Sequence, residues 1–266
     1  MDDATGKRDT RFDFYGMGDD PVPEAKPTTV GGPLKHSPYK RRRGEKDSST
    51  AALAAISEEA DGKSIPGYEL ICNVWLGSTQ YVVAQSHVDH EPVLVQSLSK
   101  AEVRNILKTS HNNVLKVVNT FFQTIGSREL HFVGWEIMQF SLLEVKAHHL
   151  LTDARLASVL GQVANGLDYL QELGLEHEEL SCASALVNDA GEVKISRLEN
   201  CQYKKSANNS AGFKKLAMDL VGFSRSGTSG NYALPSLPLT PSAVAFVEFI
   251  DKAPSSTSPK DVLMAE

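Results

Sequence analysis

The chain has 266 residues, 41% of them hydrophobic, and a net charge of -6. It can therefore bury a substantial core, and its mildly acidic balance does not favour a nucleic-acid partner. No apolar run approaches the roughly 20 residues that a membrane-spanning helix needs. The three cysteines are too few and too widely spaced for a disulfide framework or a four-ligand zinc site. We expect an intracellular protein, cytoplasmic or nuclear, with no membrane span.

Residues 1–64 are rich in Pro, Gly, Asp, Lys and Ser and show no sustained apolar period. Such a segment cannot offset the entropy lost on ordering, so we expect a disordered tail. Its basic run, Lys40 to Arg43, is either a nuclear-import or anion-contacting signal or a solvated charge cluster. The aromatic and charged residues of Arg11 to Met17 are typical of a short docking motif.

Apolar alternation begins at Ile65, where the text up to Leu98 predicts three short strands. The segment 99–110 has apolar residues at helical spacing, with Ser99 as its predicted cap. Two further strands are predicted at 116–124 and 130–138, separated by a turn at Gly126. The first half should therefore form a five-stranded sheet with one helix.

The second half changes to the helical period. A stripe of leucines and valines from Leu156 to Leu170 follows the cap candidate Thr152, and Gly174 stands where the helix should stop. Two strands, 183–188 and 192–196, enclose the turn Asp189-Ala190-Gly191. An apolar segment near 212–223 and two late segments, capped by Thr240 and Ser258, predict further helices.

The text HEELSCASALVN, from His177 to Asn188, and the following VKISRLE resemble the catalytic core of the protein kinase family. The matching family motifs are H-R-D-L-x-x-x-N, which supplies the catalytic base, and D-F-G, which holds metal ions. The resemblance implies that His177 braces the catalytic loop and that Glu179 stands at the position of the base. It also implies that Ser184 replaces the metal-binding Asn and that Arg197 replaces the Asp of D-F-G.

These substitutions weaken the chemistry that the resemblance implies. A guanidinium has no acceptor lone pair, so Arg197 cannot ligate Mg²⁺. Glu179 keeps a carboxylate on a longer arm, and the displacement of about an ångström can cost roughly a hundredfold in rate. The A-P-E segment of the family is absent.

The nucleotide-binding positions implied by the resemblance are also altered. Gln96 replaces the Lys of V-A-I-K, which removes a charge-assisted phosphate contact of roughly 1.5 to 3 kcal/mol. Glu102 falls at the position of the helix Glu and is either a hydrogen-bond partner of Gln96 or a solvated carboxylate. Gly77 alone remains of the glycine-rich loop and is either a turn residue or part of a phosphate cradle. Trp135 either fills the adenine pocket or is a core aromatic residue.

From these residues we expect an α+β, protein-kinase-like two-lobed fold with an antiparallel five-stranded small lobe and a mainly helical, shortened large lobe. The domain should span 65–266, with the small lobe at about 65–138 and the large lobe at about 139–266. We expect a pseudokinase, that is, no enzyme but a protein-interaction or regulatory scaffold in signalling, whose protein partners include an active kinase or its substrate. No cofactor or metal is expected, and ATP should bind weakly if at all.

Two alternatives to this expectation stay open. One is a protein Ser/Thr kinase with residual or atypical ATP binding and phosphoryl transfer, in which Arg197 contacts the phosphates directly. The other is a truncated gene product without a stable fold of its own.

Overall fold

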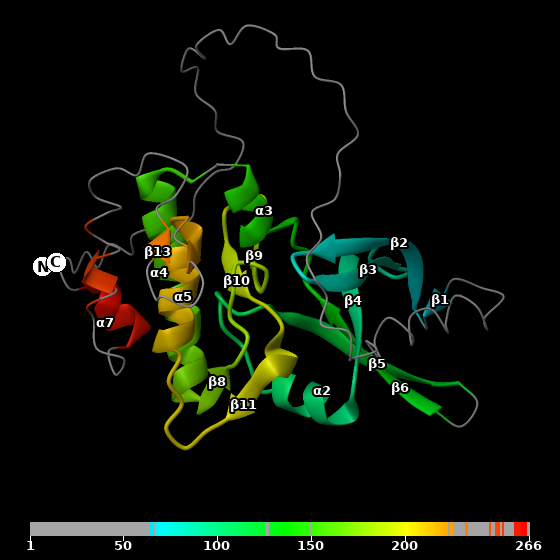
Figure 1. Ribbon diagram of the computed structural model, residues 1–266. Coiled ribbons are helices and arrows are strands. Elements are labelled where there is room, and N and C mark those ends of the chain that lie inside the picture. The colour runs from blue at the N-terminus through cyan, green and yellow to red at the C-terminus, as the bar shows by residue number, and fades with distance from the viewer. Residues whose placement is uncertain are drawn as a thin grey trace, which may run out of the picture.

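In a computed structural model of the chain, one lobe is a sheet with a single helix, and the other lobe is a group of helices with short strands (Figure 1). This arrangement is the two-lobed, α+β architecture that the sequence predicts. The structure describes residues 64–65, 67–125, 128–148, 151–222, 224–225, 232–233, 245, 248–250, 252 and 258–264.

The small lobe is a six-stranded sheet in the order β1-β2-β3-β4-β6-β5, with every neighbouring pair antiparallel. The predicted five strands are present, and the two-residue β1 adds a sixth at one edge. Strands β5 and β6 form a hairpin that runs out past α2, away from the helices of the large lobe (Figure 1). The strands are β1 Ser64–Ile65, β2 Tyr68–Leu76, β3 Thr79–Ser86, β4 Pro92–Leu98, β5 Val117–Ile125 and β6 Arg128–Trp135.

The turn between β2 and β3 consists of Gly77 and Ser78, because Leu76 pairs directly with Thr79. Gly77 has a φ of +59°, a conformation in which a side chain is rarely accommodated. A glycine at the first position of a two-residue hairpin turn is typical of type II′ geometry. The turn interpretation of Gly77 is therefore the one that the structure adopts.

The small-lobe helix α2, Lys100–Ile106, begins with a capping box. The Ser99 hydroxyl accepts a hydrogen bond from the backbone N–H of Glu102 at 3.3 Å, and the Glu102 carboxylate accepts one from the Ser99 N–H at 2.6 Å. Both residues thus satisfy N–H groups that a helix start leaves free. The predicted cap at Ser99 is confirmed.

The large lobe is organised around α4, Asp153–Glu172, which Thr152 caps through its side chain. The apolar stripe predicted for this helix is buried, and its residues belong to the main hydrophobic core. Burying one face at the helical period is what holds a helix of this length in place. The other helices are α3 Leu142–Ala147, α5 Ser210–Leu220 and α7 Pro259–Met264.

Short strands place the catalytic-loop segment against this helical core. The predicted hairpin is present as β9 and β10, which pair in register from Ala185 with Ile195 to Val187 with Val193. All six residues of these two strands are buried, so the catalytic-loop segment that leads into β9 is held in place. The remaining short elements are β7 Phe140–Ser141, β8 Leu175–His177, η1 Leu198–Asn200, β11 Cys201–Tyr203, β12 Ser224–Arg225 and β13 Tyr232–Ala233.

Several sequence predictions fall outside the described residues. They are the disordered tail over 1–64 apart from its last residue, the basic run at Lys40 to Arg43, the motif at Arg11 to Met17, the turn at Gly126 and the cap at Thr240. Ser258 does cap α7, because its hydroxyl accepts a hydrogen bond from the Asp261 N–H at 3.1 Å. Within the described part of the chain, no helix combines the length and the apolar character needed to span a bilayer.

Candidate nucleotide and catalytic site

The hairpin turn of the small lobe rests directly on the catalytic loop. A Cβ added to Gly77 would collide with the backbone carbonyl of Ala183. The two backbones can approach this closely because the turn residue has no side chain. In a kinase fold the phosphates of the nucleotide lie beneath this turn. The close contact between Gly77 and Ala183 therefore leaves little room beneath the turn.

Arg197 links three parts of the candidate site. Its guanidinium lies 2.9 Å from the carboxylate of Glu179, 3.2 Å from the hydroxyl of Ser78 and 3.9 Å from Glu199. Its φ of +58° places the residue in the left-handed region. The predicted residues Arg197 and Glu179 are thus in direct contact, whereas the role of Ser78 has no signal in the sequence.

Glu179 has the exposure that a proton acceptor needs. Its side chain is 59% exposed, and the oxygen that binds Arg197 also accepts a hydrogen bond from the Asn200 amide at 2.9 Å. Such a carboxylate can accept a proton from a hydroxyl that reaches it. In the present arrangement its charge is neutralised by Arg197.

Gln96 does not contact Glu102, the partner that counting along the chain suggested. Its amide donates instead to the carboxylate of Glu199 at 3.3 Å, while Glu102 caps α2. The second carboxylate oxygen of Glu199 is buried without a hydrogen-bond partner among the described residues. Burial raises the pKa of Glu199 above its ordinary value. Glu199 is a site residue that the sequence alone did not reveal.

Tyr81, on β3, is a buried residue beside the candidate site. It is 1% exposed and packs in the main core, and its hydroxyl lies against Ser196 and Thr79. Burial raises the pKa of the Tyr81 hydroxyl, so this group stays protonated.

His177 braces the catalytic loop, as the resemblance implies. The ring is buried, and its Nε2 lies 2.9 Å from the carbonyl oxygen of Ser196, to which a neutral imidazole donates. Burial lowers the pKa of His177, which keeps the ring neutral. The bond joins the start of the catalytic loop to the residue that precedes Arg197.

The two family positions that hold Mg²⁺ do not fit a metal ion here. Ser184 is fully buried, and its hydroxyl is engaged with the Ser181 N–H and with the carbonyls of Ser181 and Glu179. Arg197 at the other position brings a positive charge and no lone pair. Among the described residues, no cluster of three or more His, Cys, Asp or Glu side chains is arranged to hold a metal.

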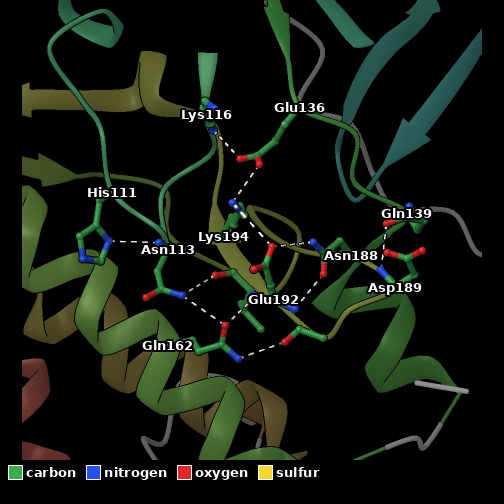
Figure 2. A network of polar contacts seen from close by, with 12 residues as sticks. His111, Asn113, Lys116, Glu136, Gln139, Gln162, Asn188, Asp189, Glu192 and Lys194 are labelled. Atoms are coloured by element: carbon green, nitrogen blue, oxygen red, sulfur yellow. Dashed lines mark hydrogen bonds and ion pairs between the residues drawn. The ribbon is translucent and has the colours of Figure 1, made fainter. Parts of the chain in front are cut away.

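A second polar network lies at the connector between the lobes, the segment 136–139 that joins β6 to β7 (Figure 2). The ammonium group of Lys194, on β10, lies 2.9 Å from one carboxylate oxygen of Glu136 and 4.0 Å from Glu192. The other oxygen of Glu136 accepts the backbone N–H of Lys116 at 2.7 Å. Since the Lys194 side chain is only 9% exposed, this ion pair anchors the connector to the large-lobe hairpin in a largely dry environment.

The same network ties the hairpin to α4. The side-chain oxygen of Gln162 accepts the backbone N–H of Val193 at 2.8 Å and the amide of Asn113 at 3.2 Å. Its amide group donates to the carbonyl of Gly191 at 3.1 Å (Figure 2). One buried glutamine therefore joins the helix, the hairpin and the segment before β5.

Trp135, at the end of β6, is 1% exposed and belongs to the main hydrophobic core. Its neighbours across the sheet are Leu94 and Val117. The indole N–H has no hydrogen-bond partner among the described residues. The structure thus places it as a core aromatic residue at the junction of the lobes.

The fold, the braced catalytic loop and the connector define a protein-kinase-like domain. The sequence profile of the protein tyrosine and serine/threonine kinase family matches residues 78–218, more than half of the chain. The chain therefore belongs to the protein kinase family.

The similar proteins are long and share little sequence identity with this chain. The serine/threonine-protein kinase STE20 of Saccharomyces cerevisiae is 22% identical over 162 residues, which are 59% of this chain and 16% of the relative. The serine/threonine-protein kinase shk1/pak1 of Schizosaccharomyces pombe is 26% identical over 95 residues, 34% of this chain and 13% of the relative. The serine/threonine-protein kinase SMU1 of Mycosarcoma maydis is 22% identical over 156 residues, 56% of this chain and 19% of the relative. The chain thus spans less than a fifth of each of these relatives.

These names correct the expectation that the chain is no enzyme. Every relative just described is named a Ser/Thr protein kinase, which points to an enzyme. The expectation rested on the loss of the phosphate-binding Lys at Gln96 and of the Mg²⁺ ligands at Ser184 and Arg197. It gave little weight to the exposed carboxylate retained at Glu179. The prediction that the chain is no enzyme was wrong on this count.

Proposed function

We propose that this chain is an atypical protein Ser/Thr kinase domain that binds ATP weakly and transfers its γ-phosphoryl group slowly. The supporting observation is the position of Arg197, whose guanidinium lies between the Gly77 turn and the catalytic-loop carboxylate of Glu179. An arginine at this place can bind phosphate oxygens through paired N–H groups. In this proposal it takes over part of the charge neutralisation that metal ions provide in other kinases.

The proposed reaction starts with an exchange of ion pairs. When the Gly77 turn lifts, the phosphates of ATP replace Glu179 and Ser78 as partners of Arg197. Glu179 is then released, and its carboxylate accepts the proton of a substrate serine or threonine hydroxyl. The hydroxyl oxygen bonds to the γ-phosphorus, the bond from that phosphorus to the bridging oxygen breaks, and ADP leaves with the bonding electrons.

Weak ATP binding follows from the same contacts. ATP must open the turn over Ala183 and displace an existing ion pair before it can bind. Gln96 is already bound to Glu199 and offers no charge to the phosphates. Each requirement subtracts from affinity, so binding in the millimolar range is expected.

The same proposal includes the organisation and setting of the domain. Residues 65–266 form the kinase domain, with the small lobe over about 65–138 and the large lobe over about 139–266. The partners are protein substrates bearing Ser or Thr hydroxyls, and the chain acts in signalling in the cytoplasm or nucleus.

Thermal unfolding with added ATP and chelator tests the binding step. We expect millimolar ATP to raise Tm without Mg²⁺ and Arg197→Met to weaken ATP binding about tenfold or more, as expected for loss of a charge-assisted contact. Arg197→Lys should retain part of the shift, because it keeps the charge and loses the paired geometry. No Tm shift at any ATP concentration would contradict the proposal.

Single-turnover transfer of radiolabel from ATP to a Ser- and Thr-containing protein mixture tests the chemistry. Glu179→Gln should lower the transfer rate roughly a hundredfold or more while leaving the ATP-induced Tm shift in place. Transfer that stays unchanged in this variant would exclude Glu179 as the base, and no transfer by the unaltered chain would overturn the enzyme proposal.

A further inference from the structure

Strand β5 is an open edge of the small-lobe sheet. It pairs with β6 on one side, and among the described residues no strand pairs with it on the other. Its outward face is exposed, with Val118 at 50% and Phe122 at 65%. The hairpin that carries it points away from the helices of the large lobe (Figure 1). A partner strand therefore has access to its free N–H and C=O groups.

The strand lacks the features by which proteins usually protect such an edge. Residues 117–125, VVNTFFQTI, contain no charged residue and no proline, and they form a strand of nine residues. Edge strands that stay unpaired generally carry a lysine, a proline or a bulge that discourages pairing. The register shift near Val117 is the one irregularity, and it lies at the start of the strand.

The sequence of β5 is nearly symmetric about Phe121. Reading outward from this residue, Thr120 is matched by Phe122, Asn119 by Gln123 and Val118 by Thr124. When two copies pair antiparallel with Phe121 at the centre, each matched residue lies opposite its counterpart in the other copy. The pairs then join amide with amide and β-branched with β-branched or aromatic residues, combinations that stabilise sheets.

We propose that β5 pairs antiparallel with β5 of a second copy of this chain, which joins two small-lobe sheets into one continuous sheet. A second copy is favoured over an unrelated strand because the symmetry about Phe121 makes β5 complementary to itself. A pair of nine-residue strands forms a small interface, so we expect a dissociation constant on the order of 10 μM for the dimer. The inference rests on the sheet and is independent of the proposed kinase activity.

Charge reversal on the outward face tests both the partner and the register. One variant of the full chain carries Thr120→Lys with Phe122→Lys, and a second carries Thr120→Glu with Phe122→Glu. In the proposed register, position 120 of one copy faces position 122 of the other, so each variant alone opposes like charges twice. Sedimentation velocity should show each variant as a monomer, with at least about tenfold weaker association than the unaltered chain. An equimolar mixture should regain the dimer.

A matched control uses the opposite end of the sheet. Trp75, on β2, is 52% exposed, and the double variant Ile71→Lys with Trp75→Lys adds the same charge there. This control should dimerise like the unaltered chain, and all variants should keep their far-ultraviolet circular dichroism and Tm. An unaltered chain that is monomeric across the concentration series overturns the proposal. Slow amide exchange of residues 118–124 in such a monomer would assign the edge to another segment of the same chain.

Discussion

The connector network around Lys194 and the catalytic-loop cluster around Arg197 contain similar side chains but differ in how fully these are partnered. At the connector, both carboxylate oxygens of Glu136 have donors, and the ammonium group of Lys194 lies between two carboxylates. At the catalytic loop, the Glu179 side chain is 59% exposed and one oxygen of Glu199 has no partner. The first cluster is built for stability, whereas in the proposed function the second keeps groups available for a ligand.

The largest effect should come from breaking the connector network. Lys194→Met removes the cation from the Glu136 carboxylate, which is itself largely buried. We expect a loss of about 3 kcal/mol in the free energy of unfolding. Arg197→Met is the matched control, since it removes a cation from a more exposed pair and should cost less than about 1 kcal/mol. Urea unfolding of both variants measures the difference.

Equal losses for Lys194→Met and Arg197→Met would show that the two clusters contribute alike to stability, and the comparison would fail. A larger loss for Arg197→Met would reverse it and make the catalytic-loop cluster the more important of the two for stability.

The second effect concerns the glutamine that joins α4 to the hairpin. Gln162→Leu leaves the N–H of Val193 and the carbonyl of Gly191 without their partners, and we expect a loss of about 2 kcal/mol. Gln202→Leu is the control, because Gln202 is exposed and its side-chain amide donates to the exposed carboxylate of Glu178. Its change should stay within about 0.5 kcal/mol in the same urea measurement. Similar losses in both variants would refute the structural role assigned to Gln162.

Local patterns predicted the frame of the fold, because they depend on neighbouring residues. The stripe of α4 follows the helical period, and the turn at Asp189 to Gly191 marks the β9–β10 hairpin. The contacts of Gln96 with Glu199 and of Arg197 with Ser78 join residues 103 and 119 positions apart, which no local pattern encodes. A short-range signal also explains why Glu102 does not bond Gln96. Ser99 and Glu102 form an S-x-x-E capping box, so Glu102 is engaged at the helix start.

The smallest expected effect is a gain in the free energy of unfolding, whereas the substitutions above lower it. Glu199→Gln removes a buried carboxylate whose pKa is raised by burial, keeps an acceptor for Gln96 and should raise stability at neutral pH by up to about 1 kcal/mol. The folded chain holds this proton to a higher pH than the unfolded chain, whose carboxyl titrates near 4.5. The free energy of unfolding therefore falls as pH rises from 4.5 through the folded pKa, and the variant should lack this component.

Urea unfolding at a series of pH values compares the Glu199→Gln variant with the unaltered chain. Glu179→Gln is the control, because it makes the same change from carboxylate to amide at an exposed side chain. A Glu199→Gln variant that is less stable than the unaltered chain at neutral pH would mean that the ionised carboxylate has a donor that compensates its burial. The catalytic-loop cluster would then be as completely partnered as the connector network, and the distinction between a structural and a ligand-binding cluster would no longer hold.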